Sequence, residues 1–399
     1  MTQHLPSPVI TCHLPHLKDP IDRDDAIWSS FLPASRAFFS DRKTDTAGYG
    51  IRYGDYFTGL STFIECSRFK AIIDAGSRQL GRQLKANELK EVRICLEKHG
   101  EYYHPARLDV AVAGGRFALV ANAAFSEPGQ TAIKNDFVNM DRLNRQFPYS
   151  FLPDVYCEDR IGLGSGLPKM RICLGQWLDG YNEFHLTRRS TSKAVEMVVW
   201  DPQRGNFYLS ENQRLDVYRQ AAMILTAYYN LETTEQIFAW HHAAGDFVLA
   251  LENASGGIDL KLITVRKYAP LIENIPAPPE AIFQALLLFL MNMTIRMRLD
   301  RLDGVAEMVW ADDHSVAATV KGFFQGLTLQ ARGDIIPAGV PTLFHAYLKD
   351  LSAEDAFDLL ASMVAQMPSG SPELSLIKTH VRDHAAALHR AIQARPDAK

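Results

Sequence analysis

The spacing of hydrophobic residues changes along this chain of 399 residues, from a helical pattern to a strand pattern and back. The region up to residue 90 is irregular as far as residue 25 and then mainly helical, although Gly76 and Gly81 disfavour a single long helix. The next region holds strand-like runs, which occupy residues 92–96, 107–112, 117–125, 154–157 and 170–178. A helix with Thr131 as its expected N-cap separates the third run from the fourth. This region is therefore predicted to contain three strands, one helix and two strands.

The remainder of the chain is predicted to be mainly helical, with two hairpins inserted. A long helix over residues 213–229 separates the hairpins, whose strands are expected at residues 195–200, 206–209, 247–251 and 260–265. The most apolar segment, residues 281–297, is interrupted by polar residues, whereas a membrane span needs roughly 20 mostly apolar residues, so it predicts a buried helix. Ser352 and Asp355 have the spacing of a capping box and mark a helix start.

Composition and charge narrow the classes of function. With 47% hydrophobic and 22% charged residues, the chain can bury a core and keep a polar surface. A net charge of −4 lacks the basic excess of proteins that bind nucleic acid or anionic membranes. The five cysteines are scattered without a C-x-x-C pair, and the first 20 residues lack the apolar core of a signal peptide. These observations predict a cytoplasmic protein that binds neither nucleic acid nor membrane.

The densest cluster of chemically active side chains is the segment His-His-Ala-Ala-Gly-Asp at residues 241–246. A histidine transfers protons near neutral pH, and a carboxylate a few residues away can orient it or bind a metal. We therefore take His241, His242 and Asp246 as the candidate catalytic residues. A purely structural loop, and a transition-metal site formed by the two histidines with Asp246, are alternative interpretations.

Two other patterns are less informative. The glycine-rich stretch at residues 162–166 precedes a strand and not a helix, so it predicts a hairpin turn in place of a phosphate loop. His380 and His384 have the spacing of a zinc-binding pair on the last predicted helix, but no third ligand accompanies them. We expect them on a solvated helix face.

The order of these elements resembles the protein-kinase-like fold, in the form found in aminoglycoside phosphotransferases and related small-molecule kinases. In that family a five-stranded antiparallel lobe with one helix precedes a hinge and a mainly helical lobe. The catalytic and metal loops flank a short hairpin that follows a long helix. The resemblance implies an α+β, two-lobed kinase-like fold, with a helical N-terminal extension at residues 1–90, an N-lobe at 91–180 and a C-lobe at 181–399.

The same resemblance assigns roles within residues 241–246. The family pattern is H-G-D-x-H-x-x-N followed directly by a strand, with the Asp at the attacking hydroxyl and the Asn on magnesium. If residues 247–251 are that strand, Asp246 falls at the metal-binding position and His241 at the position of the catalytic Asp. A second register places residues 244–246 on H-G-D and makes Asp246 the catalytic acid instead.

ATP and magnesium are the cofactors that the resemblance implies. The strand at residues 117–125 holds no lysine for the nucleotide phosphates, so Lys98, after the first strand, or Lys134, on the helix, would bind them. Glu183 follows the expected hinge and is the candidate acceptor for a ribose hydroxyl.

Two functions follow from the resemblance. The first is a kinase-like nucleotide-binding protein that acts as an ATP- and magnesium-dependent phosphotransferase on a small molecule. The residues that align with the family's D-x-G metal motif are Arg-Lys-Tyr at 266–268, which put a cation where a metal ligand is expected. This departure motivates the alternative, a catalytically inactive pseudokinase with a binding or regulatory role toward a small-molecule or protein partner. The sequence leaves the oligomeric state open.

Overall fold

The computed structural model describes residues 7–33, 50–100, 102–164, 166–188, 195–243, 245–252, 256–270, 279–304 and 306–394. The chain folds into two units. Unit 1 contains residues 1–145 and 153–179, and unit 2 contains residues 146–152 and 180–399. Both units mix helices with strands, so the expected α+β class is confirmed at that level.

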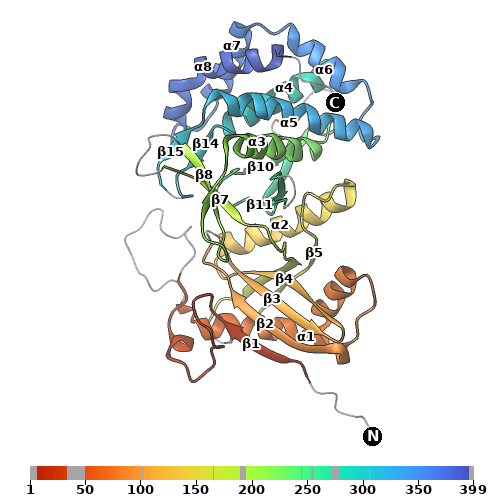
Figure 1. The fold of residues 1–399 in the computed structure, drawn as a ribbon, viewed down its shortest axis with the longest axis vertical. Coiled ribbons are helices and arrows are strands. Elements are labelled where there is room, and N and C mark those ends of the chain that lie inside the picture. Colours follow the sequence, from red (N-terminus) through yellow and green to blue (C-terminus); the bar gives the residue numbers. More distant parts are fainter. Residues whose placement is uncertain are drawn as a thin grey trace. The chain divides into compact units, whose positions relative to one another are not determined.

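Unit 1 is organised around a six-stranded sheet with the strand order β1-β2-β3-β4-β6-β5 (Figure 1). Its helices and strands are β1 (Val9–His13), α1 (Tyr53–Leu80), β2 (Leu89–Leu96), β3 (His104–Val112), β4 (Gly115–Ala124), α2 (Glu127–Gln146), β5 (Val155–Ile161) and β6 (Met170–Gln176). Neighbouring strands are antiparallel except for β1, which is parallel to β2. From β2 to β6 the order of elements is the predicted one.

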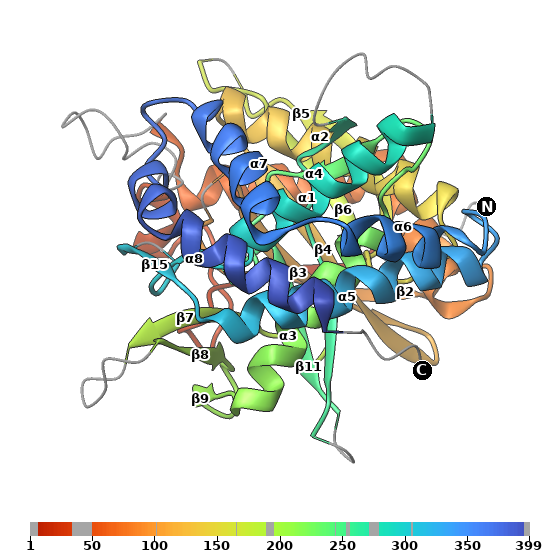
Figure 2. The same cartoon turned by 90° about the horizontal axis from the view of Figure 1, so that it is seen from above.

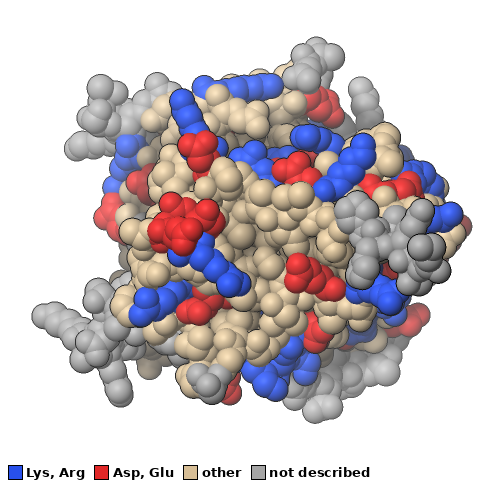
Figure 3. Space-filling view, turned by 90° about the horizontal axis from the view of Figure 1, so that it is seen from below, with Lys and Arg blue, Asp and Glu red and all other residues tan. Residues whose placement is uncertain are grey.

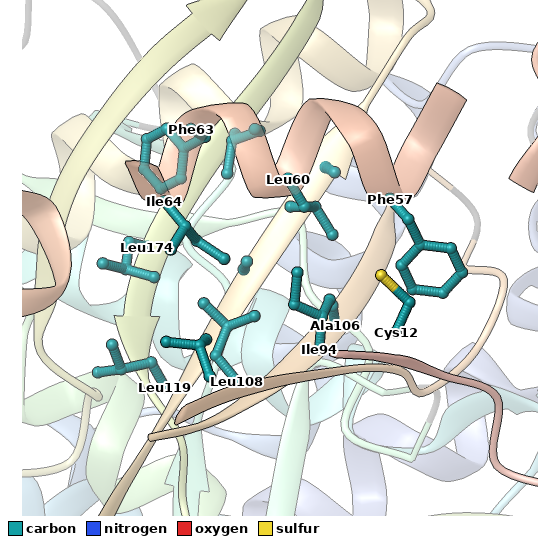
Figure 4. Packing of buried hydrophobic residues seen from close by; sticks show 14 of the residues in the cluster. Cys12, Phe57, Leu60, Phe63, Ile64, Ile94, Ala106, Leu108, Leu119 and Leu174 are labelled. Carbon is teal, nitrogen blue, oxygen red and sulfur yellow. The ribbon is translucent and has the colours of Figure 1, made fainter. Parts of the chain in front are cut away.

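The core of unit 1 lies between α1 and the sheet. Phe57, Leu60 and Ile64 recur at helical spacing and are fully buried, and Figure 4 shows their side chains directed at the strands. The sheet contributes Ile94, Ala106, Leu108, Leu119 and Leu174 to the same cluster. Because burying one such large apolar side chain contributes roughly 1.5–3 kcal/mol, this layer holds α1 on the sheet.

Two features of unit 1 differ from the expectation. Residues 9–13, expected to be irregular, form β1 and add a sixth strand to the expected five. The first 90 residues thus supply both a strand and a helix to unit 1, where only a helical extension was expected. Helix α2 starts at Glu127, before Thr131, because the Ser126 hydroxyl accepts a hydrogen bond from the Gly129 amide at 3.1 Å.

Unit 2 is mainly helical and carries short sheets. Its elements are β7 (Glu183–Arg188), β8 (Val195–Trp200), β9 (Phe207–Tyr208), α3 (Glu211–Ala227), β10 (Glu235–Phe238), β11 (Phe247–Leu251), β12 (Ile258–Leu262), β13 (Lys267–Pro270), α4 (Pro279–Arg296), β14 (Leu299–Arg301), β15 (Met308–Trp310), α5 (Asp313–Arg332), α6 (Val340–Lys349), α7 (Ala353–Ala365) and α8 (Leu374–Gln393). The two predicted hairpins are present as β8–β9 and β11–β12, and β7 pairs with the outer edge of β8.

Helix α5 is the centre of the helical part of unit 2. It packs along α3 on one side and α8 on another, as Figures 1 and 2 both show. Helix α4 covers the predicted apolar segment, and its Leu286, Leu290 and Met291 are fully buried, which confirms the predicted buried helix. In the described parts of the chain, no helix is both long enough and apolar enough to cross a membrane.

The charged residues on the face seen in Figure 3 do not segregate by sign. Lysine and arginine side chains lie near aspartate and glutamate side chains, and uncharged surface separates these mixed groups from one another. This mixture on the visible face agrees with the small net charge of −4.

Candidate functional site

The candidate site is a pair of loops in unit 2 between four short strands. One loop connects β10 to β11 and contains residues 241–246; the other connects β12 to β13 and contains residues 263–266. Antiparallel pairing of β10 with β13 and of β11 with β12 brings the two loops together, although about 20 residues separate them in sequence. Ala244 lies outside the described residues.

Asp246 joins the two loops through its carboxylate. The side chain is only 2% exposed and accepts hydrogen bonds from the His241 amide at 2.8 Å and from the Thr264 hydroxyl at 2.9 Å. Arg266 adds an ion pair, with Nη2 2.7 Å from Oδ1 of Asp246. A buried carboxylate is expensive to desolvate unless donors and an opposite charge surround it, and here both are supplied by the protein.

A second buried carboxylate holds the middle of the 241–246 loop. Asp300 on β14 is fully buried, and its Oδ2 accepts a hydrogen bond from the Ala243 amide at 2.8 Å. The same oxygen lies 3.4 Å from Nδ1 of His242. Asp246 and Asp300 therefore accept from backbone amides two positions apart, and together they fix the conformation of this loop.

His242 is enclosed in the interior of unit 2. Its side chain is fully buried, and the ring of Tyr218 on α3 lies 5.0 Å from its own, centroid to centroid. Burial lowers the pKa of His242, while the Asp300 carboxylate opposes that shift and His241 adds to it. A ring that is neutral and enclosed in this way can support the loop, but it is not placed to exchange protons with solvent.

The three candidate catalytic residues do not form one constellation. His241 has an exposed side chain and is tied to Asp246 only through its backbone amide. His242 contacts Asp300, and Asp246 contacts Arg266. Among the described residues, no three His, Cys, Asp or Glu side chains gather as metal ligands would, so the transition-metal interpretation gains no support.

Glu183 lies beside the loop. A Cβ built on Gly245 would come within 3.8 Å of a Glu183 carboxylate oxygen, and Gly245 has a φ of +89° that favours glycine. The bridge between Asn182 and Leu249, with hydrogen bonds of 2.8 and 3.0 Å, positions this start of β7 against β11.

The two candidate lysines belong to unit 1. Lys98 follows β2 in the connection to β3, and Lys134 lies on α2; both side chains are exposed.

Sequence reasoning missed two residues that shape the site. Thr264 stands at the end of the predicted second hairpin, and a hydroxyl there gave no signal of its own. Asp300 stands three residues beyond the predicted buried helix that ends at residue 297, and only the fold brings it to the 241–246 loop. An acidic residue shortly after an apolar helix was the single available hint.

No protein-family model matches the chain, and no curated protein is significantly similar to it. The residue contacts described above therefore carry the functional argument.

Proposed function

We propose that this chain is a kinase-like protein without phosphotransferase activity, in which an internal ion pair has replaced the magnesium site. Its role would then be to bind a small molecule or a protein partner. This is the pseudokinase alternative, and the contacts inside unit 2 favour it over the phosphotransferase.

The order of elements in unit 2 supports the kinase-like part of the proposal. A long helix, α3, is followed by the 241–246 loop, the β11–β12 hairpin and the 263–266 loop, which is the order that the resemblance implies. The pairing of β10 with β13 places the two loops side by side, as a catalytic loop and a metal loop would need.

The observation that carries the proposal is the ion pair between Asp246 and Arg266. Magnesium needs several oxygen ligands at about 2.0–2.1 Å in octahedral geometry, and at least one carboxylate oxygen open to it. Asp246 already accepts from two donors and pairs with the guanidinium, so a metal would have to displace a cation that is covalently part of the chain. Arg266 supplies the positive charge that magnesium would otherwise bring.

We expect millimolar magnesium with ATP to produce no thermal stabilisation beyond that given by ATP alone, because Asp246 is not open to a metal. Thermal denaturation with ATP, with magnesium and with both would measure this. A magnesium-dependent increase in melting temperature, or transfer of labelled phosphate to any small-molecule hydroxyl, would establish the phosphotransferase in its place.

A variant distinguishes a structural carboxylate from a metal-binding one. Asp246→Asn removes the charge that pairs with Arg266, so we expect it to lower the free energy of unfolding by about 1–3 kcal/mol without any metal present. Asp358→Asn, an exposed carboxylate on α7, is the matched control and should change stability by less than about 0.5 kcal/mol. If Asp246→Asn is as stable as the wild type in metal-free buffer and differs only when magnesium and nucleotide are added, the proposal is wrong.

A further inference from the structure

A pair of histidines in unit 1 faces each other across a short distance. Nδ1 of His99, in the connection between β2 and β3, lies 3.1 Å from Nδ1 of His104, the first residue of β3. The turn that brings them together is tight: the Gly100 amide donates to the Tyr103 carbonyl at 3.1 Å, and a Cβ on Gly100 would lie 2.7 Å from that oxygen.

Aromatic residues of α1 surround the pair. The Tyr53 hydroxyl lies 3.5 Å from Nε2 of His99, and the Tyr56 hydroxyl donates to the His104 carbonyl at 3.2 Å. His104 is 4% exposed and His99 is half-buried. One imidazole is therefore buried among aromatic rings, and the other is partly exposed to solvent.

Two facing ring nitrogens require a cation or a proton between them. If both rings carry their proton on Nε2, two lone pairs oppose each other at 3.1 Å, which is repulsive unless a positive charge lies between.

The spacing suits a shared metal ion. Two imidazole nitrogens that bind one tetrahedral zinc at about 2.0–2.1 Å lie about 3.3–3.4 Å apart, a few tenths of an ångström more than the 3.1 Å between the two Nδ1 atoms here. A polar group on the far nitrogen of a ligating histidine, as Tyr53 is for His99, is the usual means of fixing the ring's tautomer and orientation.

We propose that His99 and His104 together bind one transition-metal ion of the zinc, nickel or copper(II) class, with solvent completing its coordination. The site is separate from the loops around Asp246 and does not depend on the kinase-like proposal. With two protein ligands it is expected to bind in the micromolar range, which suits an ion that exchanges with the surroundings.

The test is metal titration of untagged full-length protein. Isothermal titration with zinc and with nickel should show one site in the wild type, and binding at least about tenfold weaker in His99→Gln and in His104→Gln. His16→Gln, an exposed histidine outside the pair, is the matched control and should bind like the wild type. Tyr53→Phe should retain the site with a smaller loss of affinity, because it removes only the group that orients His99.

A second measurement identifies the ligands. Copper(II) added at one equivalent should give an electron paramagnetic resonance spectrum with nitrogen splitting from two imidazoles, which simplifies in His99→Gln. If His104→Gln does not fold, His99→Gln and Tyr53→Phe still decide the result, because both alter half-buried residues. Binding that is absent in the wild type, or unchanged in His99→Gln, would show that the two rings share only a proton.

Discussion

At the scale of single residues, two buried carboxylates determine the shape of the 241–246 loop. Asp246 accepts from the His241 amide and Asp300 from the Ala243 amide, and both side chains have almost no solvent exposure. Buried charges persist only where donors satisfy them. Each carboxylate therefore stabilises a loop conformation that the local sequence alone does not specify.

Asp300 offers a direct measure of that effect. Asp300→Leu leaves the Ala243 amide without its acceptor, so we expect the free energy of unfolding to fall by about 1–3 kcal/mol. Asp300→Asn keeps an accepting oxygen and should lose less. Hydrogen exchange of peptides that contain residues 241–246 should become faster in Asp300→Leu, and unchanged exchange there would contradict a role for Asp300 in holding the loop.

At the scale of elements, the close packing of α5 against α3 in unit 2 depends on glycine. Gly322 and Gly326 lie one turn apart on α5 and face α3; a Cβ on Gly326 would lie 2.6 Å from the Thr226 Cβ and 2.7 Å from the Met223 carbonyl oxygen. Further along α5, the Gln330 side chain donates to carbonyls near the end of α3. The two helices can approach this closely only because α5 has no side chains at these two positions.

Gly326→Ala tests this packing. Alanine favours a helix over glycine by about 1 kcal/mol, yet here the methyl group would force the two helices apart, and overpacking costs about 1–3 kcal/mol. We expect a net loss of stability in urea unfolding. Lys321→Ala, an exposed change on the same helix, should be nearly neutral. A stabilised Gly326→Ala protein would mean that α3 and α5 are less tightly packed than the structure indicates.

At the scale of the whole molecule, each unit contains a histidine that folding keeps neutral. Burial lowers the pKa of His104 in unit 1 and of His384 in unit 2 to about 3. In unit 2 the Thr294 hydroxyl donates its hydrogen to the Met291 carbonyl. The hydroxyl oxygen must therefore accept from Nε2 of His384, so Nε2 carries the proton. Protonating the other nitrogen would place an unsatisfied donor in the core, because Nδ1 has no hydrogen-bond partner among the described residues.

Stability should therefore fall in mild acid. The folded pKa of about 3 lies below the usual 6.5, so the unfolded chain binds protons first as the pH decreases. Above pH 6.5 neither histidine lowers the free energy of unfolding. Below pH 6.5 each one lowers it by about 1.4 kcal/mol for each pH unit, down to about pH 3. Hydrogen exchange at pH 7.5 and 5.5 can measure both units separately, and His384→Gln should reduce the pH dependence in unit 2 only. An equal pH dependence in wild type and variant would contradict the assignment.

The sequence by itself determined those helices and strands whose signals come from neighbouring residues. Helix α3, the β11–β12 hairpin and the capping box at Ser352 and Asp355 are confirmed, because periodicity, turn residues and capping spacing are properties of neighbouring residues. The order of strands and helix from β2 to β6 was predictable for the same reason. The position of the candidate loop, between a predicted helix and a predicted hairpin, followed from these elements.

Only the tertiary structure decided which residues meet. Strand β1 exists because it pairs with β2, which lies about 80 residues away in sequence. The expectation of a solvated His384 was wrong, since α8 buries this side chain against Trp310, and no spacing within α8 indicates that contact. Likewise the residues 241–246 suggested acid–base chemistry, whereas pairing of β10 with β13 places Arg266 on Asp246. A carboxylate's chemistry depends on the groups that surround it in space, and those groups come from segments far apart along the chain.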